Sequence, residues 1–165
     1  MAQLITEDNP VLVGVSFGGI MVQEMSKHIP VKKVILISSV KCRDELPKRL
    51  KVLYNTKAYK LFPANAINSI EEFFTYFFGE FAKKRANMYK EYLSVRDEKY
   101  LTWAIYNVLS WKQTIPMENI LHIHGTADSM FPIKHIKSCI SIKNGTHVMI
   151  LNKAKTISTI LKKHI

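Results

Sequence analysis

Cysteine is scarce in this chain: only two cysteines occur among 165 residues, Cys42 and Cys139. Two distant cysteines do not form the disulfide framework of a small secreted domain, so unpaired thiols in a reducing compartment are the simpler interpretation. The first ten residues contain Glu7 and Asp8 and lack the apolar core with basic flanks of a signal peptide. We therefore expect a cytoplasmic protein.

Long hydrophobic runs, internal repeats and low-complexity segments are also missing. No stretch reaches the roughly 18 uninterrupted apolar residues that a membrane span requires. With 47% hydrophobic residues, however, the chain is long enough to bury a core. The sequence predicts a single domain over residues 1–165 with no membrane span.

Acidic residues are few, 13 against 24 Lys and Arg, which leaves a formal net charge of +11. Such a charge favours nucleic acid or another anionic partner only when the basic residues cluster. Here they are scattered in short groups such as Lys32-Lys33 and Lys162-Lys163, and none alternates with aromatic residues as a nucleic-acid groove requires. We therefore expect a solvated basic surface and no nucleic-acid partner, with an anionic partner as the less favoured alternative.

The first forty residues have the pattern of a βαβ unit. Residues Met1–Thr6 read as the end of a helix, and the β-branched run Val11–Val15 is typical of a strand buried on both faces. Apolar residues at helical spacing predict a helix over Gly18–His28, which Pro30 ends before a second strand, Val34–Ile37. A crossover of this kind joins parallel strands.

Residues 44–116 have a different, helical and aromatic pattern, and we interpret them as an insertion. Apolar residues recur there at three- and four-residue steps: Ile70, Phe73, Phe74, Phe77, Phe78 and Phe81. Such a stripe is usually the buried face of a helix that packs against the core. If it lines a pocket instead, it favours a small-molecule substrate with an apolar acyl or alcohol group.

The βα pattern resumes after the insertion. A third strand is expected over Ile120–His124, a short helix over Ile133–Ser138, a fourth strand over Ile140–Ile142 and then an amphipathic helix that contains Ile157. The predicted fold class is α/β, with a mostly parallel sheet of about four strands, flanking helices and a helical insertion.

The segment Gly14-Val15-Ser16-Phe17-Gly18-Gly19 lies between the first strand and its helix. A turn this tight needs small residues beside the serine and raises its hydroxyl above the carboxyl edge of the sheet, at a helix N-terminus. We expect the Phe17 backbone amide to donate a hydrogen bond to the oxyanion that develops on the substrate. A phosphate-binding loop is disfavoured because no Lys-Ser/Thr pair ends the turn and the spacing is not Gly-x-Gly-x-x-Gly.

A serine nucleophile needs a base and an acid that orients the base. Asp128 follows the third strand in a loop that begins at Gly125, and His147 follows the fourth strand in a loop that contains Gly145. Because the carboxyl ends of parallel strands meet at one edge of a sheet, Ser16, Asp128 and His147 form a candidate catalytic triad.

These three segments, namely the turn at Ser16, the His-Gly-x-x-Asp segment that ends at Asp128 and the Gly-x-His segment that ends at His147, resemble the catalytic signatures of the α/β-hydrolase family. The resemblance implies that Ser16 attacks a carbonyl carbon, that His147 transfers the proton and that Asp128 orients the imidazole. It also implies that residues 44–116 form a cap over the active site. We expect no cofactor and no metal.

The chain departs from the family pattern in two places. Thr146 stands where family members often have a second glycine before the histidine. The family sheet normally has eight strands with the nucleophile after the fifth, whereas here the nucleophile follows the first. We therefore expect a C-terminal part of the fold that lacks the loop with the second oxyanion donor, a loss that typically costs about 10² to 10³ in turnover.

Three functions are compatible with these features. The first is a serine hydrolase that cleaves an ester, thioester or related carbonyl substrate through an acyl-enzyme. The second is a weakly active or inactive interaction module, because Val11–Val15 would be an exposed apolar edge prone to self-association. The third is other chemistry on the same fold, such as a lyase or a carbon-carbon bond hydrolase; dehalogenases and epoxide hydrolases are disfavoured because their nucleophile in this family is Asp.

Two remaining pairs of residues have simpler interpretations. His122 and His124 alternate on one strand, but no further His or carboxylate cluster completes a metal site, so we expect His122 to pack in the sheet. Asp44 and Glu45 are neighbours that point in different directions, and we expect both to face solvent.

Overall fold

The computed structural model describes residues 2–57 and 98–165, and the predicted aromatic stripe over residues 70–81 lies outside them. The chain divides into two compact units, residues 1–46 with 112–165 and residues 47–111. All of the residues that we expected to form a site belong to the first unit. The predicted organisation, one domain with an insertion over 44–116, stays a prediction.

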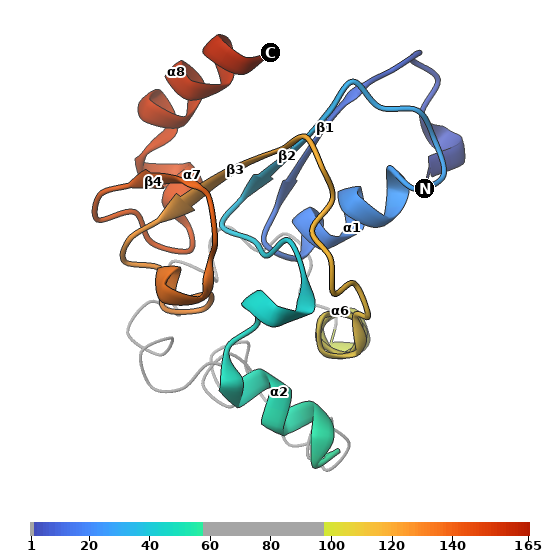
Figure 1. Ribbon diagram of the computed structural model, residues 1–165, viewed down its shortest axis with the longest axis vertical. Coiled ribbons are helices and arrows are strands. Elements are labelled where there is room, and N and C mark those ends of the chain that lie inside the picture. The colour runs from blue at the N-terminus through green and yellow to red at the C-terminus, as the bar shows by residue number, and fades with distance from the viewer. Residues whose placement is uncertain (1, 58–97) are drawn as a thin grey trace. The chain divides into compact units, whose positions relative to one another are not determined.

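The first unit is built on a four-stranded parallel sheet (Figure 1). Its strands are β1 (Val11–Val15), β2 (Lys33–Ile37), β3 (Ile120–Gly125) and β4 (Ile140–Ile142), and their order in space is the same as their order in the sequence. The predicted α/β fold class with a parallel sheet is thus confirmed. Val15 pairs with Ile37, and Ile37 pairs with Ile123, so the carboxyl ends of β1, β2 and β3 reach the same edge.

Helices cover both faces of this sheet, as Figure 1 shows for α1 (Phe17–Met25) and α8 (Ala154–His164). A Cβ added at Gly19 of α1 would lie 3.3 Å from the Leu36 side chain, so α1 packs on the face that carries Leu36. The next residue, Ile37, points to the opposite face and forms a buried cluster with Met149 of α7 (Met149–Asn152) and Ile157 of α8.

The structure shortens three predicted helices. The helix α1 ends at Met25, three residues before His28, and is followed by hydrogen-bonded turns. Only a short 3₁₀ helix forms at Ala2–Leu4. A second short 3₁₀ helix, Ile133–His135, ends there because Ile136 is already extended, at φ −90° and ψ 125°. These segments make few helical hydrogen bonds, and periodicity alone does not determine where a helix frays.

The described part of the second unit is helical, as its pattern predicts. It contains α2 (Lys48–Asn55) and α6 (Glu98–Ser110), which contact each other. Among the described residues of the whole chain, no helix has both the length and the apolar character needed to cross a membrane.

The strand β1 lies at an edge of the sheet within the described residues, since it pairs only with β2. Val13 at its centre is 45% exposed although it is β-branched and apolar. An edge strand with unpaired backbone groups and apolar side chains is a template for pairing with another chain.

We predict that the protein self-associates through β1 and that Val13→Lys weakens this association, because a charged side chain on an edge strand opposes pairing. Light scattering across a concentration series measures the effect. Val52→Lys, at a 58% exposed valine in α2, is the matched control and leaves the association unchanged. A wild-type protein that stays monomeric throughout the series contradicts the prediction.

Candidate active site

Ser16 is the single residue between β1, which ends at Val15, and α1, which begins at Phe17. Its backbone has φ 53° and ψ −122°, in the positive-φ region that a residue with a Cβ rarely adopts. Two hydrogen bonds to the Ser16 carbonyl hold this conformation: one from the Gly19 amide at 2.9 Å and one from the Ser39 hydroxyl at 2.7 Å. Backbone strain of this kind persists only where the surroundings over-determine it, and it is frequent at active sites.

Two glycines allow a close approach at this turn, Gly14 between β1 and α1 and Gly19 between α1 and the segment that follows β2. A Cβ at Gly14 would lie 2.3 Å from the Gly18 carbonyl oxygen, and a Cβ at Gly19 would lie 2.3 Å from the Ser39 hydroxyl. Gly18, in contrast, has open space where its Cβ would be. The requirement for small residues that we expected beside Ser16 therefore applies to Gly14 and Gly19 but not to Gly18.

The structure brings Ser16, His147 and Asp128 together in one hydrogen-bonded series. His147 Nε2 lies 2.8 Å from Ser16 Oγ, and His147 Nδ1 lies 2.9 Å from Asp128 Oδ2. The other carboxylate oxygen, Asp128 Oδ1, accepts hydrogen bonds from the amides of Met130 at 2.8 Å and Phe131 at 2.9 Å. Asp128 and His147 are buried, and Ser16 is half-buried.

The environment of Asp128 keeps this side chain ionised. Burial by itself raises the pKa of the carboxyl, but the charge and hydrogen bond of His147 and the Phe131 amide outweigh it and hold the pKa below the usual 3.8. A carboxylate can only accept hydrogen bonds, so His147 Nδ1 carries a proton. A ring that carries its single proton on Nδ1 has its lone pair on Nε2, and this atom faces the Ser16 hydroxyl.

A pair of glycines brings the Asp128 loop against the His147 loop. A Cβ at Gly125 would lie 2.2 Å from the carbonyl oxygen of Gly145, so a larger residue does not fit there. The same loops are joined by hydrogen bonds from the Ala127 amide to the Gly145 carbonyl at 2.8 Å and from the Asn144 amide to Thr126 Oγ1 at 2.9 Å.

Thr146, which replaces a glycine frequent in the resembled family, has a cost in this structure. Its hydroxyl oxygen is buried and has no hydrogen-bond partner within the described residues, as is also true of Ser38 Oγ. An unsatisfied buried hydroxyl typically costs about 1 to 3 kcal/mol. Threonine therefore fits at position 146, but its hydroxyl contributes no hydrogen bond to the described part of the structure.

The prediction that Glu45 faces solvent is wrong. Glu45 is 1% exposed, whereas its neighbour Asp44 is exposed as expected. The 3₁₀ helix Arg43–Glu45 turns the Glu45 carboxylate back toward Lys41: Oε2 accepts the Lys41 amide at 2.7 Å, and Oε1 lies 2.8 Å from Lys41 Nζ. No sequence signal distinguishes this buried ion pair from two charges in a loop.

His122 is buried at 2% exposure, which confirms its predicted packing in the sheet, and it also takes part in a polar contact that we did not predict. Its Nδ1 lies 3.1 Å from Lys41 Nζ. Burial first, then the Lys41 charge and His124, lower the pKa of His122 to about 3. Burial also lowers the pKa of His124. Within residues 2–57 and 98–165, no group of three His, Cys, Asp or Glu side chains could hold a metal ion.

The solved structures that this chain resembles are α/β-hydrolases. This chain has a partial α/β-hydrolase fold. It is similar to a lipase-esterase related protein from Clostridium acetobutylicum, with a TM-score of 0.62 and 18% identity over 99% of this chain and 72% of that one. Sequence comparisons with protein-family models and with curated proteins give no significant match.

Two further similar structures come from Rhodococcus species. The 2-hydroxy-6-oxo-6-phenylhexa-2,4-dienoate hydrolase of strain RHA1 has a TM-score of 0.55 at 18% identity, and the esterase RhEst1 of strain ECU1013 has 0.53 at 18% identity. The matches cover 95% and 94% of this chain. The chain spans 64% of the length of each of these two proteins, so it corresponds to less than two thirds of either.

We predict that Gly125→Ala destabilises the fold by about 1 to 3 kcal/mol, because the new methyl group would overlap the backbone of Gly145. The matched control is Gly18→Ala, where the methyl group meets open space within a helix and is expected to be neutral or stabilising. Thermal unfolding followed by circular dichroism measures both. Equal unfolding midpoints for the two variants would contradict the prediction.

The low pKa of His122 predicts how stability depends on pH. Below pH 6.5 the unfolded chain protonates this imidazole, whereas the folded chain does so only near pH 3, so the free energy of unfolding falls as the pH falls across this window. His122→Gln should reduce that slope by about one proton. Urea unfolding between pH 4 and 8 measures the slope, and identical slopes in the two proteins would refute the assignment.

Proposed function

We propose that this protein is a serine hydrolase that cleaves an ester, thioester or related carbonyl substrate through an acyl-enzyme intermediate. The observation that carries the proposal is the uninterrupted series Ser16, His147 and Asp128, joined by hydrogen bonds of 2.8 and 2.9 Å, with the serine on a strained turn between strand and helix. The names of the similar structures, a lipase-esterase related protein, a hydrolase and an esterase, support the same class of reaction.

Each member of the triad has a separate role in the proposed reaction. Ser16 Oγ attacks the carbonyl carbon while its proton passes to His147 Nε2, which lies 2.8 Å away. The resulting imidazolium is stabilised by the Asp128 carboxylate. It delivers the proton to the leaving alcohol or thiol as the tetrahedral intermediate collapses, the bond to the leaving group breaks and the carbonyl re-forms as the acyl-enzyme. Water, deprotonated by His147, attacks the acyl-enzyme in the same way and releases the acid and free Ser16.

The proposed oxyanion donor is the Phe17 amide at the first position of α1. The helix N-terminus adds a positive end of the backbone dipole at the place where negative charge develops on the substrate oxygen. No second donor is assigned among the described residues.

The alternative function, an interaction module with weak or no catalysis, is favoured by the exposed apolar edge at β1. A small-molecule substrate with an apolar group remains a prediction, because the aromatic residues that would line its pocket lie outside the described residues. The proposed mechanism uses no cofactor and no metal.

A fluorophosphonate probe tests the proposal, because it phosphonylates an activated serine and leaves ordinary hydroxyls unmodified. Wild-type protein should be labelled and Ser16→Ala should not, while Ser138→Ala, at an exposed serine, keeps the label. Asp128→Asn should slow labelling by about 10⁴-fold, because the imidazole loses its orienting acceptor. Equal labelling of wild type and Ser16→Ala would exclude Ser16 as the nucleophile, and a folded wild type without any label would favour the interaction module.

A further inference from the structure

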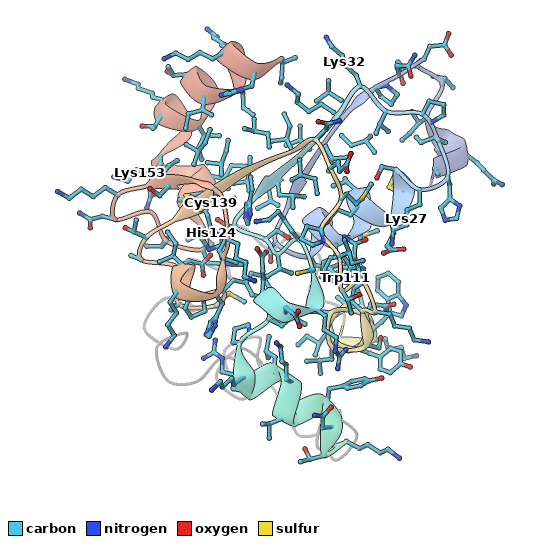
Figure 2. All side chains as sticks on the ribbon, viewed as in Figure 1. Lys27, Lys32, Trp111, His124, Cys139 and Lys153 are labelled. Atoms are coloured by element: carbon cyan, nitrogen blue, oxygen red, sulfur yellow. The ribbon has the colours of Figure 1, made fainter. Side chains whose placement is uncertain are left out.

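A continuous series of buried polar groups extends from the triad away from Ser16. His124, labelled in Figure 2, has its Nε2 atom 2.8 Å from the Phe131 carbonyl oxygen and 3.5 Å from Asp128 Oδ2. Its Nδ1 lies 3.2 Å from His122 Nε2, and His122 Nδ1 in turn lies 3.1 Å from Lys41 Nζ. Lys41 Nζ is paired with Glu45 Oε1 at 2.8 Å, and the proposed mechanism uses none of these four side chains.

The Phe131 carbonyl, at the triad end of this series, determines which nitrogen of each imidazole ring carries a proton. A carbonyl oxygen can only accept, so His124 Nε2 donates to Phe131. In a neutral ring His124 Nδ1 is then an acceptor, and the facing His122 Nε2 must donate to it. The remaining nitrogen, His122 Nδ1, accepts a hydrogen bond from the Lys41 ammonium group.

At the other end of the series, acceptors surround the Lys41 ammonium group and fix the direction of its hydrogen bonds. An ammonium group has three protons, and Lys41 Nζ meets three acceptors: Glu45 Oε1, His122 Nδ1 and the carbonyl of Lys137. The same Glu45 oxygen accepts the Lys137 amide at 3.0 Å. Burial is the largest cause that lowers the pKa values of both His122 and His124, and it favours the neutral rings that this pattern requires.

Phe131 connects this series to both the acid and the base of the triad. Its carbonyl accepts the His124 N–H, and its amide donates to Asp128 Oδ1 at 2.9 Å. Its ring packs edge-on against the His147 imidazole, with centroids 5.4 Å apart and an interplanar angle of 70°. The orientation of the peptide at Phe131 therefore influences the carboxylate and the imidazole together.

We propose that His124 is a positioning residue for the Ser16–His147–Asp128 triad. Its Nε2–H donates a hydrogen bond to the Phe131 carbonyl and so fixes the loop that holds Asp128 and packs on His147. Glu45 and Lys41 act through His122 to impose the tautomer of His124 that is protonated at Nε2. His124 is completely buried, so it acts on the reaction only through these neighbours. This assignment deepens the proposed hydrolase function and rests on it for its kinetic consequences, although its structural consequences are independent of turnover.

A pair of amide substitutions at His124 tests which ring nitrogen matters. In His124→Gln the side-chain amide reaches the place of Nε2 and can still donate to Phe131, whereas in His124→Asn it reaches only the place of Nδ1. We expect His124→Gln to keep kcat within about threefold and His124→Asn to lower it by about 10²-fold, the cost of a displacement near 1 Å at a catalytic group. KM should not change in either variant, since His124 is not exposed to substrate.

A structural variant separates positioning from loss of stability. Val34→Ala removes packing in the amino half of β2, where Val34 is 4% exposed, and should lower the unfolding midpoint without lowering kcat. If Val34→Ala and His124→Asn, at matched loss of stability, reduce kcat equally, His124 has only a structural role and the proposal is overturned. Equal kcat values for His124→Asn and wild type overturn it as well.

Proton NMR gives a readout that does not depend on hydrolysis. The His147 Nδ1 proton, shared with Asp128, should give a low-field resonance in wild type and His124→Gln that moves upfield in His124→Asn. In wild type, ¹⁵N–¹H spectra should show His122 and His124 as neutral rings protonated at Nε2; a proton on His124 Nδ1 would overturn the proposal even if no variant folds. If wild type shows these resonances but neither labels with the probe nor turns over esters, the hydrolase function fails and the positioning role stands.

Discussion

The hydrogen bond between His147 Nδ1 and Asp128 Oδ2 is the interaction on which the rest of the site depends. It places the imidazole proton on the side away from Ser16 and leaves a lone pair on Nε2 that accepts the serine hydroxyl. That arrangement requires an ionised carboxylate inside the protein, which burial disfavours. Burial raises the pKa of Asp128, but His147 and the Phe131 amide outweigh this effect and hold the pKa below its usual value.

The fold maintains this hydrogen bond by bringing backbone segments into very close contact. Parallel pairing places the ends of β1, β2 and β3 at one edge, and the loops after β3 and β4 touch where Gly125 meets Gly145. Close contacts also occur around the strained Ser16, where Gly14 meets the backbone of Gly18 and Gly19 meets the Ser39 side chain. In each case a Cβ would overlap atoms of a neighbouring segment, so glycine here provides space between segments more than conformational freedom.

The buried ion pair of Lys41 and Glu45 lies at the far end of the polar series that begins at the candidate site. A buried ion pair contributes little net stability, because removing two charges from water costs about as much as their attraction returns. Its effect here is directional: a fully satisfied ammonium group orients His122, and His122 orients His124. Such a network favours one arrangement of protons over the alternatives, which is the condition under which a polar core is specific.

The sequence by itself indicated the order of strands and helices, the parallel sheet and the three residues of the candidate site, Ser16, Asp128 and His147. These features depend on local patterns: apolar period, glycine turns and loops at strand ends. The tertiary structure decided what depends on distant partners. Glu45 was expected in solvent and is buried on Lys41, and His124 acquires its place beside the triad only because β3 pairs between β2 and β4. Burial and hydrogen-bond partners arise from segments far apart in the chain, and a local pattern does not contain that information.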